Sequence, residues 1–343
     1  MEHGLFFYLS SWGAAVVIAS VALFLVTHVS FFQERFLRRE SGRDCLIPRS
    51  YRFGGALLAV IFLILLVFDG RLEWGPSLLA LWIGSLATIV FSVADDVRHV
   101  SWPWHLLFQA LLGILVFSSD MRLDIGAYVE GMEINTAFSL GLIGVVVWVV
   151  LIMNAINWAD GTDGLMPGVA FLSFNTLFFL ALRPEVNQPT IAILAAMLSG
   201  LALALLFFNW HPARILAGTG GAYFFGFSLA VLGLYAGMKV ATLLLVLAIP
   251  VFDALFVVLR RLSLGRSPFR ADQEHLHHLL LTRGWHPTMI AIAYLLVTCL
   301  MALLALFLEG GEKALVFLIT GILLLLFSIG LHLSLHPVRE TRQ

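Results

Sequence analysis

Two neighbouring carboxylates, Asp95 and Asp96, follow an apolar run at residues 77–94. Adjacent carboxylates repel each other unless a cation lies close by, and oxygen ligands of this kind suit Mg²⁺ or Mn²⁺. The pair is therefore a candidate divalent-metal site. A solvated helix end in which Arg98 balances the charge accounts for the two residues equally well when they are considered alone.

A second polar segment, residues 154–165, follows the apolar run at 137–153. Its candidate substrate-binding residues are Asn154, Asn157, Asp160 and Asp163. Both aspartates precede a glycine, and Asp-Gly pairs favour tight turns, while asparagine side chains both donate and accept hydrogen bonds. We expect this segment to present amides and carboxylates to ribose, uracil or a metal-bound phosphate. The alternative is an Asx-rich turn without a ligand.

A third polar segment, residues 209–221, begins at Asn209 and contains the glycines Gly218, Gly220 and Gly221. Closely spaced glycines before a helix let backbone amides approach an anion at the positive end of the helix dipole. Because glycine-rich turns are common, this segment is only a weak indication of a phosphate site.

Basic residues gather further along the chain. Guanidinium groups stay charged and bind phosphate oxygens in pairs, so Arg266 and Arg270 are candidate phosphate ligands. Arg260 and Arg261 are explained equally well by the preference of basic residues for the cytoplasmic side of a membrane. Asp253 precedes them by less than two helical turns, and it either joins a metal site or pairs with an arginine.

Three histidines, His275, His277 and His278, follow within four positions. They could supply a metal ligand or donate hydrogen bonds to a pyrophosphate. On a helix, His275 and His278 would share one face and His277 would point elsewhere. We therefore do not expect a single metal site formed by all three.

The elements that hold these residues are predicted to be membrane helices. The chain has 343 residues, of which 60% are hydrophobic and 12% charged, and its mean hydropathy is +0.97. Soluble domains carry about 25% charged residues, and a bilayer-spanning helix needs about 20 apolar residues. The composition predicts an all-α, polytopic transmembrane bundle that forms a single domain over residues 1–343.

Apolar runs separated by polar breaks predict eleven spanning helices. Their expected bounds are 5–27, 54–68, 77–94, 104–118, 137–153, 168–182, 190–208, 221–236, 240–259, 289–308 and 314–333.

Basic residues near helix ends remain on the cytoplasmic side, and this rule sets the orientation. With the N-terminus outside and the C-terminus in the cytoplasm, fifteen of the twenty Lys and Arg residues are cytoplasmic. The expected cytoplasmic loops are about 28–53, 95–103, 154–167, 209–220 and 260–288. All the polar clusters described above then lie on one face of the membrane. A transporter would instead spread its charged residues through the membrane depth.

The remaining bulk properties exclude some classes of protein. The net charge of −1 gives no electrostatic basis for binding nucleic acid. The two cysteines, Cys45 in a polar loop and Cys299 in an apolar run, predict neither a disulfide nor a thiolate metal site.

These motifs resemble those of the polyprenyl-phosphate N-acetylhexosamine-1-phosphate transferases, the glycosyltransferase family 4 enzymes that include bacterial UDP-GlcNAc:undecaprenyl-phosphate GlcNAc-1-phosphate transferases. The resemblance covers nearly the whole chain. Its motifs are the paired aspartates Asp95 and Asp96, the double Asp-Gly segment 154–165, Asn209, Pro250 with Asp253, and the His-x-His-His sequence that ends at His278.

The resemblance implies transfer of a sugar 1-phosphate, expected to be N-acetylhexosamine 1-phosphate, from a UDP-sugar to a polyprenyl phosphate, with release of UMP. It implies Mg²⁺, or Mn²⁺, bound by Asp95 and Asp96, catalytic histidines at His275, His277 and His278, an inner-membrane enzyme whose active site faces the cytoplasm, and a role in cell-wall or polysaccharide biosynthesis. It also suggests a homodimer.

The chain departs from the family at one position. Where the family has Gly-Asp-x-Gly, this sequence has Thr219 between Gly218 and Gly220, so a hydroxyl replaces a carboxylate implied to bind the metal. The missing metal ligand is then Asp253, or the hydroxyl of Thr219 takes its place. The alternative is a catalytically weakened member that binds the lipid carrier or partner proteins.

Overall fold

The computed structural model describes residues 4–28, 53–119, 121–122, 133–235, 239–265 and 274–335, with the backbone alone for Val97. Every regular element in these ranges is a helix. The helices are α1 Leu5–His28, α3 Gly54–Phe68, α4 Pro76–Arg98, α5 Trp102–Ser118, α6 Ile134–Ala159, α7 Leu165–Ala181, α8 Pro189–Asn209, α9 Gly218–Tyr235, α10 Val240–Val246, α11 Ala248–Ser263, α12 Leu276–Thr282, α13 Pro287–Phe307 and α14 Gly310–Leu335. The all-α prediction is confirmed.

Six of the helices are long and apolar enough to cross a bilayer, and the pair formed by α10 and α11 makes a seventh if it is one broken span. Three shorter apolar helices, α3, α5 and α7, pack among them. The chain is thus a multi-pass membrane protein. The eleven spans and the sides on which the termini lie stay predictions.

The single helix expected at 240–259 is wrong. The chain forms α10 and α11, which meet at Leu247 and are inclined by 79°. Pro250 explains the break, because it lacks an N–H and its ring would collide with the carbonyl of residue 246 in a continuous helix. In the first turn of α11 the proline costs no hydrogen bond, so a new helix starts there in a new direction.

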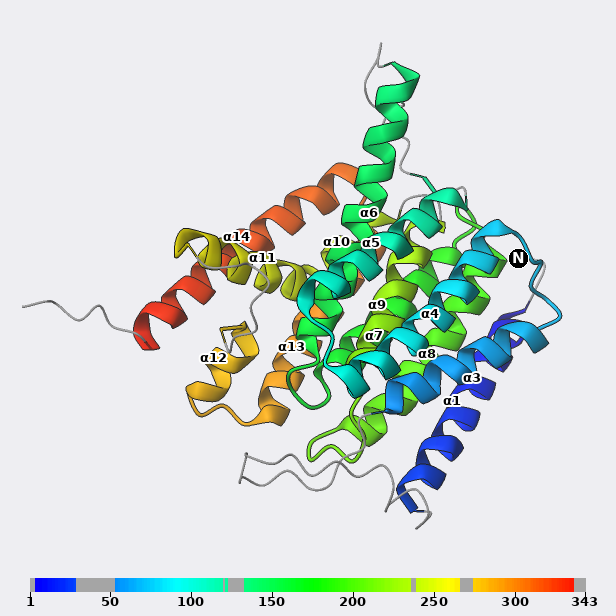
Figure 1. Cartoon of the computed structure of the whole chain (residues 1–343), viewed down its shortest axis with the longest axis horizontal. Coiled ribbons are helices and arrows are strands. Elements are labelled where there is room, and N and C mark those ends of the chain that lie inside the picture. Colours follow the sequence, from blue (N-terminus) through cyan, green and yellow to red (C-terminus); the bar gives the residue numbers. More distant parts are fainter. Residues whose placement is uncertain are drawn as a thin grey trace, which may run out of the picture.

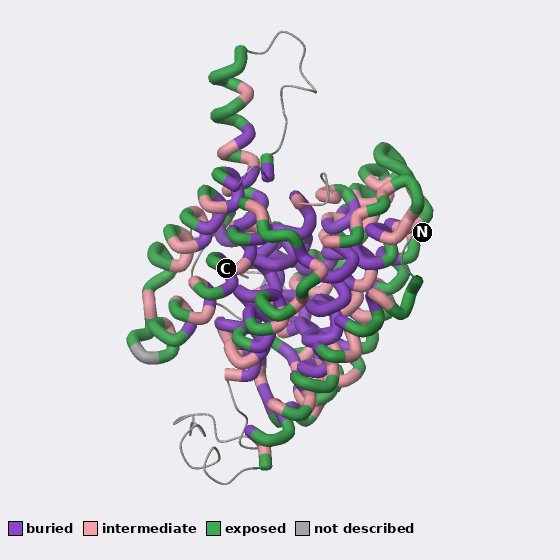
Figure 2. Tube along the Cα trace, turned by 90° about the vertical axis from the view of Figure 1, so that its right-hand side faces the viewer, coloured by how far each residue is buried: buried purple, intermediate pink, exposed green. Residues whose placement is uncertain are grey.

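The centre of the bundle is α9, whose residues Gly220 to Leu234 are all buried. Around it lie α3, α4, α6 and α7, with α8 between α7 and α1 (Figure 1). Burial falls towards the periphery, where α14 and the first turns of α6 are largely exposed (Figure 2). Exposed leucine, isoleucine and phenylalanine side chains on α14 suit contact with lipid.

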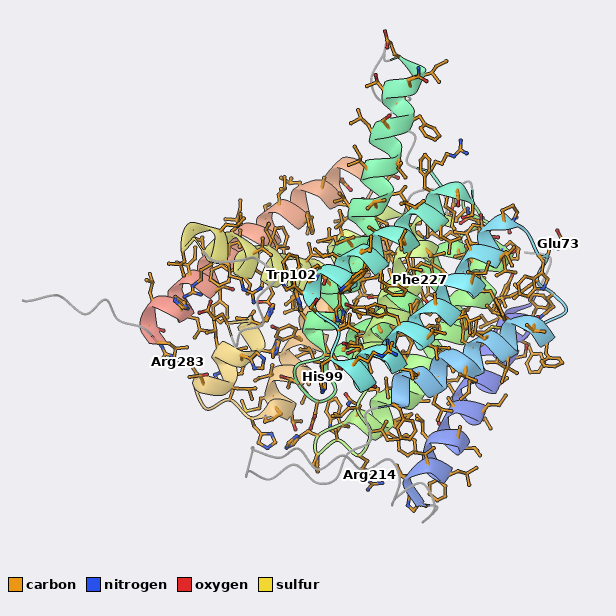
Figure 3. The ribbon with its side chains drawn as sticks, in the orientation of Figure 1. Glu73, His99, Trp102, Arg214, Phe227 and Arg283 are labelled. Atoms are coloured by element: carbon orange, nitrogen blue, oxygen red, sulfur yellow. The ribbon has the colours of Figure 1, made fainter. Side chains whose placement is uncertain are left out.

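The polar segments share one end of the bundle. In Figure 3, His99 after α4 and Arg214 before α9 lie in the lower half of the molecule, His99 near its middle, whereas Glu73, between α3 and α4, lies at the right-hand edge. The fold therefore gathers the ends of several helices where the functional residues were expected.

Candidate active site

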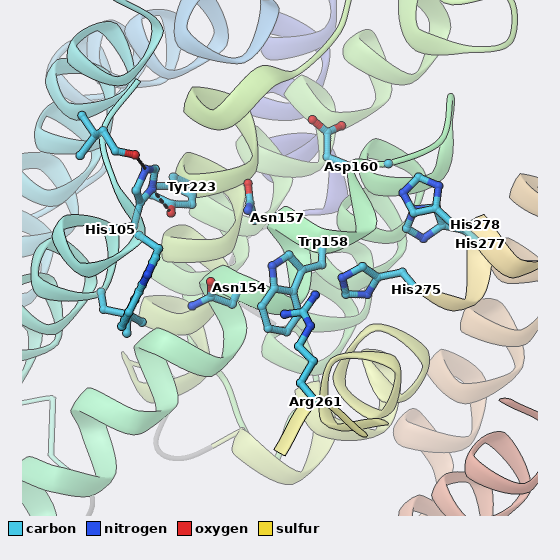
Figure 4. A pocket seen from close by; sticks show the side chains of 14 residues that line it. His105, Asn154, Asn157, Trp158, Asp160, Tyr223, Arg261, His275, His277 and His278 are labelled. Carbon is cyan, nitrogen blue, oxygen red and sulfur yellow. Dashed lines mark hydrogen bonds between the residues drawn. The ribbon is translucent and has the colours of Figure 1, made fainter. Parts of the chain in front are cut away.

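A polar pocket of about 410 Å³ opens between α5, α6, α9, α11 and α12 (Figure 4). Side chains from five separate helices or helix ends converge on it. Its lining residues are Val100, Trp102, His105, Leu106, Asn154, Asn157, Trp158, Asp160, Gly161, Tyr223, Arg261, His275, His277 and His278. Of the predicted site residues, the pocket brings together Asn154, Asn157, Asp160 and the three histidines.

The end of α6 supplies one wall of this pocket. The helix runs to Ala159, so Asn154 and Asn157 are helical and do not lie in the loop expected at 154–167. The Nδ2 atom of Asn154 donates to Gln109 Oε1 at 2.6 Å and to the Val150 carbonyl at 2.8 Å. These bonds hold the amide in place at the pocket wall.

The other expected loops are also shortened by helix. Helix α4 continues to Arg98, α9 begins at Gly218, and α11 reaches Ser263. Apolar runs mark the part of a helix that lipid or core surrounds, whereas the backbone bonds that define the helix continue into polar sequence. The predicted loop at 28–53 lies outside the described residues, apart from its two end residues.

The three histidines all face the pocket, so the expectation that His277 points elsewhere is wrong. His275 precedes α12 in an extended conformation, and helical spacing therefore does not apply to it. The rings of His275 and His277 lie nearly parallel, with centroids 5.9 Å apart, and the His278 ring is 4.2 Å from His277.

His277 is the buried member of this cluster, with an exposed fraction of 1%. Its Nε2 atom has no hydrogen-bond partner among the described residues, and it packs against Gly161. Burial, followed by the neighbouring His278 and His275, holds the pKa of His277 well below its ordinary value. The imidazole is therefore neutral at pH 7.

Asp253 positions the histidine segment. Its carboxylate accepts hydrogen bonds from His275 Nδ1 at 3.0 Å and from the backbone N–H of Leu276 at 2.7 Å, and it is buried. The second bond satisfies an amide at the start of α12. Asp253 therefore orients His275, and neither the expected arginine partner nor a metal-ligand role is needed to explain its burial.

Asp95 belongs to a second network at the pocket. Its Oδ1 atom lies 3.3 Å from His105 Nε2 and accepts the Val100 N–H at 3.0 Å. The other ring nitrogen of His105, Nδ1, lies 2.7 Å from the Tyr223 hydroxyl (Figure 4). Asp95 therefore stands beside the pocket and contacts it through His105. Asp96 is exposed in the last turn of α4.

One of the two arginines whose role the sequence left open lines the pocket. Arg261 is buried and lines the cavity, while Arg260 pairs with Glu274. A buried guanidinium beside a polar cavity is suited to an anion. The two predicted phosphate ligands, Arg266 and Arg270, lie outside the described residues.

A second cavity of about 490 Å³ adjoins the polar pocket, and Asp160 and Gly161 line both. Asp163 lies in its wall, where it accepts hydrogen bonds from His211 Nδ1 at 2.8 Å and from the Ala213 N–H at 3.1 Å. The double Asp-Gly segment thus separates the polar pocket from the second cavity. Asp160 lies between the two, and Asp163 lies in the wall of the second cavity.

Asn209 has a positioning role in this second cavity. Its Oδ1 atom accepts the Gly164 N–H and its Nδ2 atom donates to the Ile215 carbonyl, both at 2.8 Å. The residue is 2% exposed. It therefore ties the Asp-Gly turn to the segment that precedes α9.

The glycines before Tyr223 serve helix packing. A Cβ atom on Gly220 would come within 2.7 Å of Ser92 Oγ on α4, and one on Gly55 of α3 would lie 2.0 Å from the Gly221 Cα. These residues let three helices approach closely, which replaces the expected anion-binding turn. Thr219 is half-buried in the first turn of α9, beside the helix that carries the aspartate pair.

A third cavity, of about 570 Å³, lies between α6, α10, α11 and α14. Val147, Leu255 and Phe317 are among its walls, and the surface it exposes is apolar throughout. It shares two lining residues, Asn154 and Trp158, with the polar pocket. An apolar cavity therefore adjoins a polar one across the last turns of α6.

Within the described part of the chain, a metal site is not preformed by three protein ligands. Among the residues that the structure describes, no group of three or more His, Cys, Asp or Glu side chains is placed to hold a metal ion. Mg²⁺ often binds through one or two carboxylates together with substrate phosphates and water. Asp160 in the pocket and Asp95 beside it provide such carboxylates. The residues present therefore fit a metal that arrives with a diphosphate.

Several pocket residues were missed from the sequence, notably His105, Tyr223 and Trp158. His105 and Tyr223 are polar residues near the ends of apolar runs on the predicted cytoplasmic side of the membrane. This position in the sequence could have indicated that they belong to the site. Trp158 lies inside the double Asp-Gly segment, but its aromatic side chain gave no indication of a role.

Comparison with known sequences gives a consistent family. Residues 78–237 match glycosyl transferase family 4. The chain is 28% identical over 296 residues to the probable undecaprenyl-phosphate N-acetylglucosaminyl 1-phosphate transferase of Bacillus subtilis (strain 168), an alignment that covers 83% of this chain and 80% of the relative.

Two further relatives bear similar names. The undecaprenyl-phosphate alpha-N-acetylglucosaminyl 1-phosphate transferase of Yersinia pestis is 27% identical, with 85% of this chain and 79% of the relative covered. The decaprenyl-phosphate N-acetylglucosaminephosphotransferase of Mycobacterium leprae (strain TN) is 31% identical, with 71% and 60% covered.

Proposed function

Because residues 78–237 match glycosyl transferase family 4 and the relatives named above align with most of the chain, we propose that it transfers N-acetylglucosamine 1-phosphate from a UDP-sugar to a polyprenyl phosphate and so starts the synthesis of a lipid-linked glycan. The observation that carries the proposal is the junction of an apolar cavity with a polar pocket that holds three histidines, an aspartate and a buried arginine.

In this reaction an oxygen of the lipid phosphate attacks the phosphorus attached to the sugar. The bond from that phosphorus to the oxygen bridging the two phosphates breaks, and UMP leaves with its electron pair. The attacking phosphate is already anionic near neutral pH, so positioning and charge stabilisation supply most of the catalysis. Arg261 and the histidines are placed to hold phosphate oxygens in the polar pocket.

The apolar cavity is suited to the first part of the polyprenyl chain. It exposes no polar surface, and it lies between helices at the bend between α10 and α11. A lipid there places its phosphate in the adjoining polar pocket. The donor nucleotide then occupies the second cavity, which adjoins the polar pocket at Asp160 and Gly161, on the side away from the lipid.

Magnesium is the proposed cofactor, with manganese as a substitute, and Asp160, Asp95 and Asp96 are its proposed ligands. The bound ion would neutralise charge on the diphosphate. Asp253 is engaged with His275 and Leu276, and we assign it to positioning. Thr219 precedes Gly220 on α9, and Gly220 packs against Ser92 on α4. Ser92 lies about one helical turn before the aspartate pair, so the Thr219 hydroxyl stays a candidate metal ligand.

We place the enzyme in the inner (plasma) membrane with the pocket facing the cytoplasm. In the topology predicted from the sequence, fifteen of the twenty Lys and Arg residues are cytoplasmic, and a charged UDP-sugar does not cross a bilayer unaided. The homodimer stays a prediction. The names of the relatives do not favour the alternative of a weakened member that only binds lipid or partner proteins.

The test is a transfer assay with purified chain in lipid. UDP-N-acetylglucosamine labelled in the sugar, undecaprenyl phosphate and Mg²⁺ should give label in the lipid phase and an equal amount of UMP. EDTA should abolish both products, and added Mg²⁺ or Mn²⁺ should restore them. Asp160→Asn should reduce turnover at least 100-fold, whereas Glu73→Gln, an exposed residue at the other end of the bundle, should retain it. Absence of product with a panel of UDP-sugars would refute the function.

A further inference from the structure

We propose that Trp158 recognises the isoprene unit next to the lipid phosphate and makes the enzyme selective for polyprenyl phosphates whose first unit is unsaturated. The inference rests on the proposed function, because it concerns the lipid substrate of that reaction. It assigns a specificity-determining role to a residue that the family motifs leave unexplained.

The position of Trp158 carries the argument. Among the described residues, Asn154 and Trp158 alone line both the polar pocket and the apolar cavity. They are four residues apart on α6 and therefore occupy one face of its last two turns. A lipid whose phosphate is in the polar pocket and whose chain is in the apolar cavity must cross between the cavities at this face.

The crossing point is held by its neighbours. The Trp158 ring lies 5.2 Å from the His275 ring at an inclination of 40°, and Asp253 fixes His275 in turn. Asn154 is fixed by Gln109. In Figure 4, Trp158 lies beside His275 and Arg261, next to the groups that would hold the phosphate. The indole is thus a supported wall and not a freely rotating side chain.

The chemistry of the first isoprene unit makes this wall selective. In a polyprenyl phosphate that unit contains a double bond, so its carbons are coplanar and can lie flat on an indole. In a saturated first unit the branched carbon is tetrahedral, and its hydrogen and methyl group hold the chain away from the ring. Aromatic contacts of this size change binding by roughly 3- to 10-fold.

The experiment compares undecaprenyl phosphate with the same lipid reduced at its first double bond, for purified wild type and three variants. Wild type should prefer the unsaturated lipid by about 3- to 10-fold in kcat/KM. In Trp158→Leu the KM for the unsaturated lipid should rise by about the same factor, the preference should disappear, and the KM for UDP-N-acetylglucosamine should stay within about twofold of wild type.

The other variants separate recognition from folding. Trp158→Phe keeps a flat ring and should retain most of the preference for the unsaturated lipid. This variant still tests the inference if the leucine variant folds poorly. Trp102→Phe alters a second tryptophan that lines the polar pocket but not the apolar cavity, and it should keep the wild-type ratio.

Two results would overturn the inference while leaving the transfer reaction intact. The first is equal use of both lipids by wild type, and the second is an unchanged preference in a folded Trp158→Leu protein. If wild type makes no product with either lipid, the proposed function fails, and the inference fails with it.

Discussion

Substitution of Gly161 by alanine should disable the histidine cluster without altering a charge. A Cβ atom at this position would lie 2.0 Å from His277 Nε2, 2.8 Å from its Cε1 and 3.0 Å from its Cδ2. Nonbonded heavy atoms need about 3.5 Å, so the ring must withdraw by roughly 1.5 Å. His277 is buried between His275 and His278, and it has little room to move.

The magnitude follows from that displacement. A shift of about 1 Å in a group that positions substrate costs on the order of 100-fold in rate, and overpacking a buried site costs about 1–3 kcal/mol in the free energy of unfolding. We expect Gly161→Ala to lower kcat about 100-fold. Gly70→Ala is the matched control, because nothing lies within 4 Å of its added Cβ.

A double-mutant cycle identifies the cause. His277→Ala removes the ring that the new methyl group would meet, so Gly161→Ala in that background should lower kcat by less than about twofold further. The measurements are UMP release under saturating substrates and thermal unfolding in detergent. Equal losses with and without the His277 ring, or full activity of Gly161→Ala, would show that this contact does not set the geometry.

Three other predictions test the supporting contacts and the titration of the cluster. Asp253→Asn should lower kcat at least tenfold, because a hydrogen bond to a charged group contributes about 1.5–3 kcal/mol and here orients His275. Steady-state kinetics should show this fall in kcat with unchanged KM values, and a wild-type kcat would contradict the prediction. Asn209→Ala should lower the free energy of unfolding by about 2–4 kcal/mol, since it leaves two buried backbone groups unpaired; thermal unfolding measures this, with the exposed Asn135→Ala as control. Because burial lowers the pKa of His277, the unfolded chain binds a proton near pH 6.5 that the folded chain does not bind. The free energy of unfolding should therefore keep its full value above about pH 6.5 and fall as the pH drops below it. The melting temperature of His277→Asn should fall less steeply with decreasing pH, and identical pH profiles for the two proteins would contradict this prediction.

The hydropathy of the sequence located the helices because both lipid and the protein core surround apolar side chains. The run expected at 54–68 matches α3 at both ends. Elsewhere the helices extend past the apolar runs, as α6 does through Asn157 to Ala159. Backbone hydrogen bonding does not end where side chains become polar. A bend such as the one before Pro250 depends on how the new helix packs, and the proline alone gave no angle.

The contents of the pocket were harder to predict than its existence. His275 and His277 converge because the chain is extended at one of them and helical at the other, which no single spacing rule describes. His105 and Tyr223 are 118 positions apart and meet only through the packing of α5 and α9. Asp253 and Asn209 look like ligands in a motif, yet their partners are backbone amides and a histidine.

The position of the densest motif follows from the arrangement of the cavities. Asn154 and Trp158 border the apolar cavity and the polar pocket, and Asp160 and Gly161 border the polar pocket and the second cavity. One segment at the end of α6 thus meets lipid chain, phosphates and nucleotide in succession in the proposed complex. Each residue there has a different neighbour to satisfy, so amides, an aromatic ring, carboxylates and glycines must alternate within ten positions. Packing alone would not require such a mixture, and a segment bordering three chemically different ligands does.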